Sequence, residues 1–299
     1  MTRPDTVDPT GRALAHVAAR SDPAAPALDR DLRVTLGFHP DRRAARGGPT
    51  LLESLAQDGV YRSQFETGTS NGGLTAHRGG ARWRWEQEIF GGAYDGAPPS
   101  ARPRYGALDR PGGPGPGGAP RFGSAHLRLR EEVLDRATFC FPDSALAPTA
   151  FATAAHFDLW PLVAAWDARP LTDEVEAGPG GRLDAYVEAH VHGPVLLAGD
   201  VEALVLDPCW RGTATDRQAG LLGVPVEWHE GRRLSVAELA RHPAYRGPQT
   251  VEVGLRVAQD GLLDARVIGH AVEAGAEDPQ QLKRVWHHVA RWGEAVEPR

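Results

Sequence analysis

The residues that most clearly suggest chemistry lie on one predicted strand, in the sequence YVEAHVHG at residues 186–193. Strict alternation places Tyr186, Glu188, His190 and His192 on one face of this strand and small apolar residues on the other. A strand face with one carboxylate and two imidazoles is either exposed to water or part of a site. The same spacing of two histidines could also hold a metal ion such as zinc or iron.

A metal site would need a third ligand, for which His126 or the pair His39 and Asp41 are the candidates. The chain has 12 histidines, so one such close pair is expected by chance. A metal-dependent hydrolase that uses His190 and His192 is therefore an alternative hypothesis, and the leading hypothesis contains no metal.

Two further segments concentrate polar side chains. YRSQFETGTSNGG at 61–73 offers many hydrogen-bonding groups, and its glycines would let the backbone approach a ligand. In PRFGSAHLRL at 120–129, alternation places Ser124, His126 and Arg128 on one strand face. An ordinary solvated turn and a solvated sheet face are the alternatives for these two segments.

The sequence contains no P-loop and no HExxH zinc motif. A serine hydrolase would have Ser144, His126 and Asp143 as its candidates, but no nucleophile elbow surrounds Ser144. The local sequence therefore assigns no common enzyme class.

The elements that must position these groups are short strands and a few helices. Apolar patterns predict strands at 33–39, 124–130, 137–141, 224–229, 250–258 and 265–272, with two adjacent strands or a strand and turn within 183–208. Capping residues and apolar stripes predict helices at 9–20, 50–59, 157–166 and 278–293. We therefore expect an α+β fold with mixed, mainly antiparallel sheets and peripheral helices, not a doubly wound parallel sheet.

The expected domain organisation is an N-terminal helical appendage at 1–30 followed by a single α+β catalytic domain at 31–299. Between Gly96 and Arg121, 14 of 26 residues are glycine or proline. This composition predicts a mobile loop at 96–121 with no packed element.

Composition and charge limit the classes of partner. The 33 basic residues against 39 acidic residues give a net charge of −6, which argues against bulk binding of nucleic acid. No apolar stretch approaches the roughly 18 residues of a membrane helix, and no secretory signal is recognisable. We therefore expect a cytoplasmic protein without a membrane partner, although secretion by a toxin route that needs no signal stays open.

An ordered series of motifs resembles the bacterial domain-of-unknown-function family 3626. The motifs are FHPDR at 38–42, YRSQFETGTSNGG at 61–73, PRFGSAHLRL at 120–129 and YVEAHVHGPV at 186–195. The resemblance covers roughly residues 31–270, and the family name implies no activity.

A second resemblance does imply an activity. A strand-borne histidine or arginine, then a strand with serine or threonine, then a strand with glutamate is similar to the arrangement of ADP-ribosyltransferases. That resemblance implies two packed sheets with a cleft for NAD. It implies Glu188 as the catalytic carboxylate, with Ser124 and His126 beside it. The NAD-binding residues that it implies are His39, Arg42, Arg62, Thr69, Ser70, Asn71, Arg121 and His190.

The resulting hypothesis is an enzyme that binds NAD and transfers ADP-ribose to an unknown acceptor, such as a protein. Tyr186 stands where arginine-modifying transferases have Glu or Gln, and His190 stands where family 3626 is expected to have Gln. The resemblance therefore does not identify arginine as the acceptor. The non-enzyme alternative is a nucleotide-binding or toxin-associated module that uses the same cleft.

Overall fold

The computed structural model describes residues 8–43, 47–68 and 75–296, and its centre is one eight-stranded sheet. The strands of this sheet are β1 (Arg33–Phe38), β3 (Arg104–Asp109), β4 (Ala125–Leu129), β5 (Ala137–Phe141), β6 (Ala150–Thr153), β7 (Glu188–Val191), β9 (Val201–Leu206) and β10 (Val226–Trp228). Their order is β10-β9-β4-β1-β3-β7-β5-β6, and only β9 and β10 pair in parallel. The predicted strands at 33–39, 124–130 and 137–141 are confirmed.

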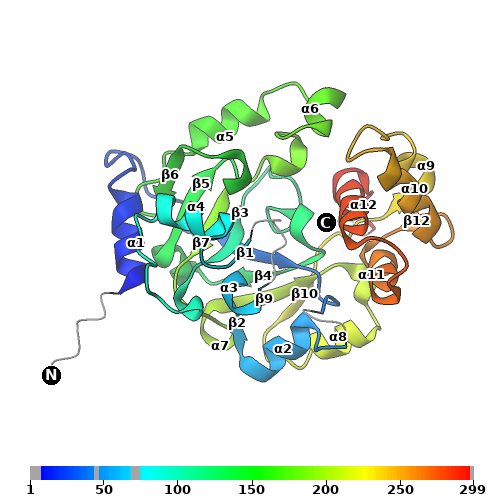
Figure 1. Ribbon diagram of the computed structural model, residues 1–299, viewed down its shortest axis with the longest axis horizontal. Helices are drawn as coiled ribbons and strands as arrows, with labels where there is room; N and C mark the ends of the chain where they lie inside the picture. The colour runs from blue at the N-terminus through cyan, green and yellow to red at the C-terminus, as the bar shows by residue number, and fades with distance from the viewer. Residues whose placement is uncertain (1–7, 44–46, 69–74, 297–299) are drawn as a thin grey trace.

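Helices and two short strand pairs surround this sheet (Figure 1). The pairs are β2 (Val60–Tyr61) with β8 (Val195–Leu196) and β11 (Leu234–Ser235) with β12 (Leu262–Leu263). The helices are α1 (Pro9–Ala18), α2 (Leu51–Asp58), α3 (Gln64–Thr67), α4 (Ala81–Ile89), α5 (Trp160–Asp167), α6 (Asp173–Ala177), α7 (Leu197–Asp200), α8 (Ala214–Ala219), α9 (Val236–Leu239), α10 (Pro248–Val257), α11 (Ala265–Ala274) and α12 (Pro279–Trp292). The predicted α+β class is confirmed. The described strands form one large continuous sheet instead of two large packed sheets.

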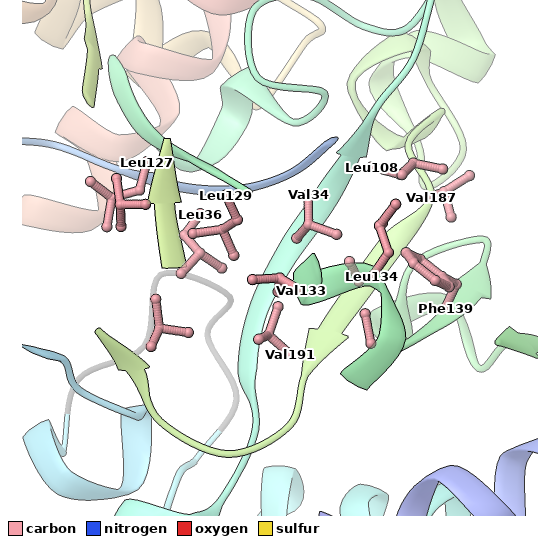
Figure 2. Packing of buried hydrophobic residues seen from close by; sticks show 14 of the residues in the cluster. Val34, Leu36, Leu108, Leu127, Leu129, Val133, Leu134, Phe139, Val187 and Val191 are labelled. Atoms are coloured by element: carbon pink, nitrogen blue, oxygen red, sulfur yellow. The ribbon is translucent and has the colours of Figure 1, made fainter. Parts of the chain in front are cut away.

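The main hydrophobic core covers one face of the large sheet. Figure 2 shows its apolar side chains, contributed by several strands together with Val133 and Leu134 of the 3-10 turn η3 (Glu131–Arg136). Because side chains alternate along a strand, Val187 on this face implies that Glu188 points to the opposite face. The register pairs Glu188 with Ala107 of β3 and with Cys140 of β5. The second face of the sheet therefore carries the polar groups.

Helix α1 begins as the sequence predicts. The side chain of Asp8 accepts hydrogen bonds from the amides of Thr10 and Gly11, which caps the helix. Ala13 and Val17 are buried in a small apolar cluster that also contains residues of α4 and β5. The division into an appendage at 1–30 and a catalytic domain at 31–299 stays a prediction.

Two predicted strands in the C-terminal part are wrong. Residues 250–258 and 265–272 form most of α10 and α11. Pro248 stands in the first turn of α10, while Asp264 caps α11 through the amide of Val267. These helix-starting features outweigh the strand preference of the β-branched residues. Helices α9 to α12 gather on one side of the molecule (Figure 1) and form most of a second apolar core.

The predicted loop at 96–121 is also wrong in part, because strand β3 lies within it and occupies the middle of the sheet between β1 and β7. Gly106 belongs to this strand, and a Cβ atom there would clash with the carbonyl oxygen of Thr35. At position 106 glycine is needed because two backbones approach closely. The glycines at 112–118 lie between β3 and η2, where the chain forms no helix or strand.

The segment 183–208 also differs from expectation. Its strands β7 and β9 are not neighbours, since β3, β1 and β4 lie between them in the sheet. The chain leaves β7 through β8 and the short helix α7 before it enters β9. Within the described residues, no helix combines the length and apolar composition needed to cross a membrane.

Candidate functional site

A small cavity lies on the polar face of the sheet. Its charged and phenolic lining residues are Tyr61, Arg82, Tyr105, Arg121, Asp143, Tyr186 and Glu188. They come from β2, α4, β3, the 3-10 turn η2 (Pro120–Phe122), the turn after β5, and β7 with the segment that leads into it. The cavity volume is about 80 Å³, below the roughly 300–1,000 Å³ of typical ligand pockets. The cavity is therefore small, but its lining is dense in ionisable groups.

Glu188 is the carboxylate at the back of this cavity and is only 4% exposed. The amide of Ser144 donates to its Oε2 at 2.9 Å. Its Oε1 has no hydrogen bond among the described residues. Arg82 Nη1 at 3.7 Å and His190 Nε2 at 3.4 Å lie within ion-pair distance of this oxygen. Glu188 thus presents one buried oxygen whose capacity to accept hydrogen bonds is not used.

The environment keeps Glu188 ionised. Burial raises its pKa, but His190, Arg82 and the amide of Ser144 together outweigh burial, so that the pKa lies below its usual value. A buried carboxylate that stays charged at neutral pH can stabilise a positive charge that develops close to it.

Asp143 is the second carboxylate of the cavity. The hydroxyl of Tyr186 donates to its Oδ2 at 2.8 Å, and Arg121 Nη1 lies 3.5 Å from the same oxygen. Burial raises the pKa of Asp143, and the negative charge of Glu188 raises it further. The two carboxylates therefore titrate apart, which is the usual arrangement for one ionised group and one acid or base.

Arg82 forms an ion pair with Glu188, and no motif in the sequence identifies it. Its guanidinium lies over the ring of Tyr105 at 3.9 Å from the centroid, and its Nη1 donates to Ser144 Oγ at 3.4 Å. Helix α4 also carries Glu86, which accepts from the hydroxyl of Tyr105 and pairs with Arg102. Arg82 and Glu86 are four residues apart on the helix. Opposite charges at this spacing are common on exposed helix faces, so the sequence does not indicate that this pair is buried.

His190 and His192 lie behind the cavity and not in it. Each places a ring nitrogen 3.0 Å from Thr138 Oγ1, and Tyr94 contacts the other nitrogen of His192 at 2.6 Å. Burial lowers the pKa of both imidazoles. Among the described residues, no group of three His, Cys, Asp or Glu side chains is arranged to hold a metal ion. In this structure His190 supports Glu188 and does not line the cavity.

Ser124 and His126 line a second, smaller cleft of about 10 Å³. Ser124 Oγ lies 3.4 Å from His39 Nδ1, and His126 stacks on His229. Burial lowers the pKa of His39 and of His126 to about 3, so both are neutral at pH 7. Neither Ser124 nor His126 lines the cavity of Glu188, so the structure does not bring the three expected catalytic residues together.

The two clefts share a wall formed by Gly37, Gly117 and Ala119. Ser144 lines the cavity of Glu188 on one side of this wall, while His126 lies on the other. The serine-hydrolase candidates Ser144 and His126 are therefore separated as well.

The expected NAD-binding residues are scattered. Arg121 lines the cavity of Glu188. Arg62 does not, because its side chain is 52% exposed and pairs with Asp58 at 2.8 Å. Arg42 is half-buried beyond the end of β1, beside His39. The other candidates on the polar segment, Thr69, Ser70 and Asn71, lie outside the described residues.

The fold and the site define an α+β protein with a charged cavity on one face of its large sheet. The chain matches the model of the family DUF3626, which is described as a protein of unknown function, over residues 33–167 and 161–294. It belongs to that family. No curated protein gives a significant match.

Proposed function

We propose that the cavity binds NAD, breaks the bond between nicotinamide and ribose, and passes ADP-ribose to an acceptor. One observation carries this proposal: Glu188 Oε1 is buried, ionised and without a hydrogen bond, and its side chain lines a cavity that also contains Arg121. A carboxylate of this kind suits a substrate on which positive charge develops during the reaction.

In the proposed reaction, Glu188 acts in the first step and Asp143 in the second. When the bond between C1′ and the nicotinamide nitrogen breaks, its electron pair leaves with nicotinamide, and the ribose becomes a cation that Glu188 stabilises. The acceptor then forms a bond to C1′ and gives its proton to Asp143, whose raised pKa makes it a stronger base than an ordinary aspartate. Arg121 offers donors to the diphosphate, while Arg82 helps to keep Glu188 ionised.

A dinucleotide does not fit in a cavity of about 80 Å³. Gly117 of this wall belongs to the segment with the sequence PGGPGPGG at 111–118, and Ala119 directly follows that segment. Displacement of this wall would join the two clefts and bring Ser124 and His126 to the same ligand as Glu188. The proposal therefore includes movement of this segment when NAD binds.

Binding of NAD is expected to raise the temperature of unfolding, because a ligand that binds only the folded state stabilises it by about 2.7 kcal/mol at 100 times its Kd. Arg121→Gln should lose most of this shift, since Arg121 lines the cavity. Arg62→Gln is the matched control because its exposed side chain lies outside the cavity. An equal shift in both variants, or no shift in the wild-type protein, would contradict an NAD site in this cavity.

The rate of transfer should fall as the pH is lowered through the pKa of Asp143. The base must be deprotonated to accept the proton, and burial raises the pKa of Asp143 above that of an ordinary aspartate. The rate of transfer is therefore expected to fall at a higher pH than it would with an aspartate of ordinary pKa as the base. A pH profile of product formation measures the effect, and Asp143→Asn should lack this acid limb. An unchanged limb in that variant would assign the base to another residue.

A further inference from the structure

Basic residues of the C-terminal part of the chain lie within electrostatic range of Arg121 or of one another: Lys283 and His287 on α12, and Arg246, which precedes α10. Lys283 and His287 are one turn apart on α12 and therefore lie on the same helix face. Trp286, on the same helix, donates from Nε1 to the carbonyl of Pro120 at 2.9 Å. This contact docks α12 on the turn that carries Arg121, so Lys283 and His287 are brought to the side of the cavity where Arg121 lies.

Several polar atoms in this region are buried without a partner. His287 is 5% exposed, yet neither of its ring nitrogens has a hydrogen bond among the described residues. The Nε atoms of Arg121 and Arg246 are buried without a partner as well. Buried polar groups are almost always satisfied in native structures. Three side chains with unused nitrogens in one place therefore indicate a ligand that contributes oxygen atoms.

The same region gathers positive charge. Burial, together with the charges of Arg121, Arg42 and Arg246, lowers the pKa of Lys283 to about 8. The charges of Arg121, Arg246 and Lys283 also act on His287. These side chains must lie within each other's electrostatic range, which is about 10 Å in water with moderate salt.

Within the described residues, not all of these arginines are paired with an acid. Arg121 pairs with Asp184 and Asp143, and Arg42 acts on the carboxylate of Asp41. Arg246 forms no ion pair with any residue in the described part of the chain. Like charges held together at a partly buried position cost stability unless an anion binds between them.

We infer that Arg246, Lys283 and His287 form, together with Arg121, a binding site for a diphosphate group. A diphosphate fits better than a single phosphate, because it carries more negative charge and more acceptor oxygens for cations that come from separate elements. The inference deepens the proposed function and rests on it for the identity of the complete ligand: a diphosphate held here would place its sugar toward Glu188. Lys283 and His287 of α12, with Arg246 and Arg121, would then hold the phosphates of a nucleoside diphosphate, while Glu188 of the sheet takes part in the chemistry.

The test uses the full chain and inorganic pyrophosphate, with binding measured by titration calorimetry at constant ionic strength. Lys283→Gln and Arg246→Gln should each weaken binding about tenfold, and Lys283→Arg should restore most of it. Arg256→Gln is the matched control, since Arg256 is an exposed arginine on α10 that pairs with Glu277. This control removes the same charge from the same group of helices and should bind pyrophosphate as the wild type does.

Pyrophosphate affinity that is equal in Lys283→Gln, Arg246→Gln and the control would overturn the site, as would no binding at millimolar pyrophosphate. Orthophosphate should bind at least tenfold more weakly, and equal affinity would overturn the assignment to a diphosphate. Glu188→Gln should bind pyrophosphate normally. If the wild-type protein releases no nicotinamide but its pyrophosphate binding depends on Lys283 and Arg246, the proposed reaction fails and the diphosphate site stands. If the wild-type protein releases nicotinamide but its pyrophosphate binding does not depend on Lys283 and Arg246, the diphosphate site is ruled out and the proposed reaction stands.

Discussion

Glu188→Gln is expected to lower the rate of nicotinamide release from NAD by about 10³-fold, which is the loss typical of one preorganised electrostatic group. Glutamine has the same shape and can still accept a hydrogen bond from the amide of Ser144. It has no negative charge, however, so the ribose cation is no longer stabilised. The release of nicotinamide, followed by chromatography, measures the effect directly.

The matched control for this experiment is Glu202→Gln. Glu202 is a carboxylate on β9 that pairs with Arg33 and Arg128 outside the cavity. The substitution Glu202→Gln removes the same charge and should leave the rate of nicotinamide release unchanged. The shift in unfolding temperature caused by NAD should persist in Glu188→Gln, because the diphosphate contacts are intact. Undiminished release in Glu188→Gln would rule out Glu188 as the catalytic carboxylate.

The helices that could be predicted from the sequence are those with local signals at both ends. Thr50 caps α2 and Gly59 ends it in a left-handed conformation, as the pattern at 50–59 indicates. At the start of α12, the side chain of Asp278 caps the helix and Pro279 stands in its first turn. The errors in α10 and α11 arose because valine-rich segments favour strands when read alone. In the folded chain, caps and packing in the second core decide their conformation.

The site could be predicted only where its residues share one element. Alternation along β7 identifies Glu188 as a polar residue with an apolar neighbour on each side, but leaves open whether its face is exposed to water or part of a site. The structure shows that Glu188 is buried. The proximity of Arg82, Asp143 and Arg121 depends on contacts between α4, the turn after β5 and η2. No spacing in the sequence encodes such contacts. With 33 basic residues, nearly all of them arginines, no single arginine stood out.

Gly106 is important both for the central sheet and for the cavity, although nothing in the surrounding sequence indicates this. It lies in β3, beside β1, and it also lines the cavity of Glu188. A Cβ atom there would meet the carbonyl oxygen of Thr35 and a methyl group of Leu36, both on the neighbouring strand. Backbone atoms of a central strand cannot move aside without breaking the pairing that holds β3 in the sheet.

Gly106→Ala is therefore expected to lower the free energy of unfolding by about 3 kcal/mol, the upper end of the usual cost of overpacking. The control is Gly199→Ala, because a Cβ atom at Gly199 in α7 would have no neighbour within 4 Å. That substitution should be neutral or stabilise the protein slightly, by reducing the entropy of the unfolded chain. Urea unfolding of the two variants compares them directly. If Gly106→Ala proves as stable as Gly199→Ala, then β1 and β3 are not packed as closely as the sheet requires, and the wall of the cavity that they form would have to be placed differently.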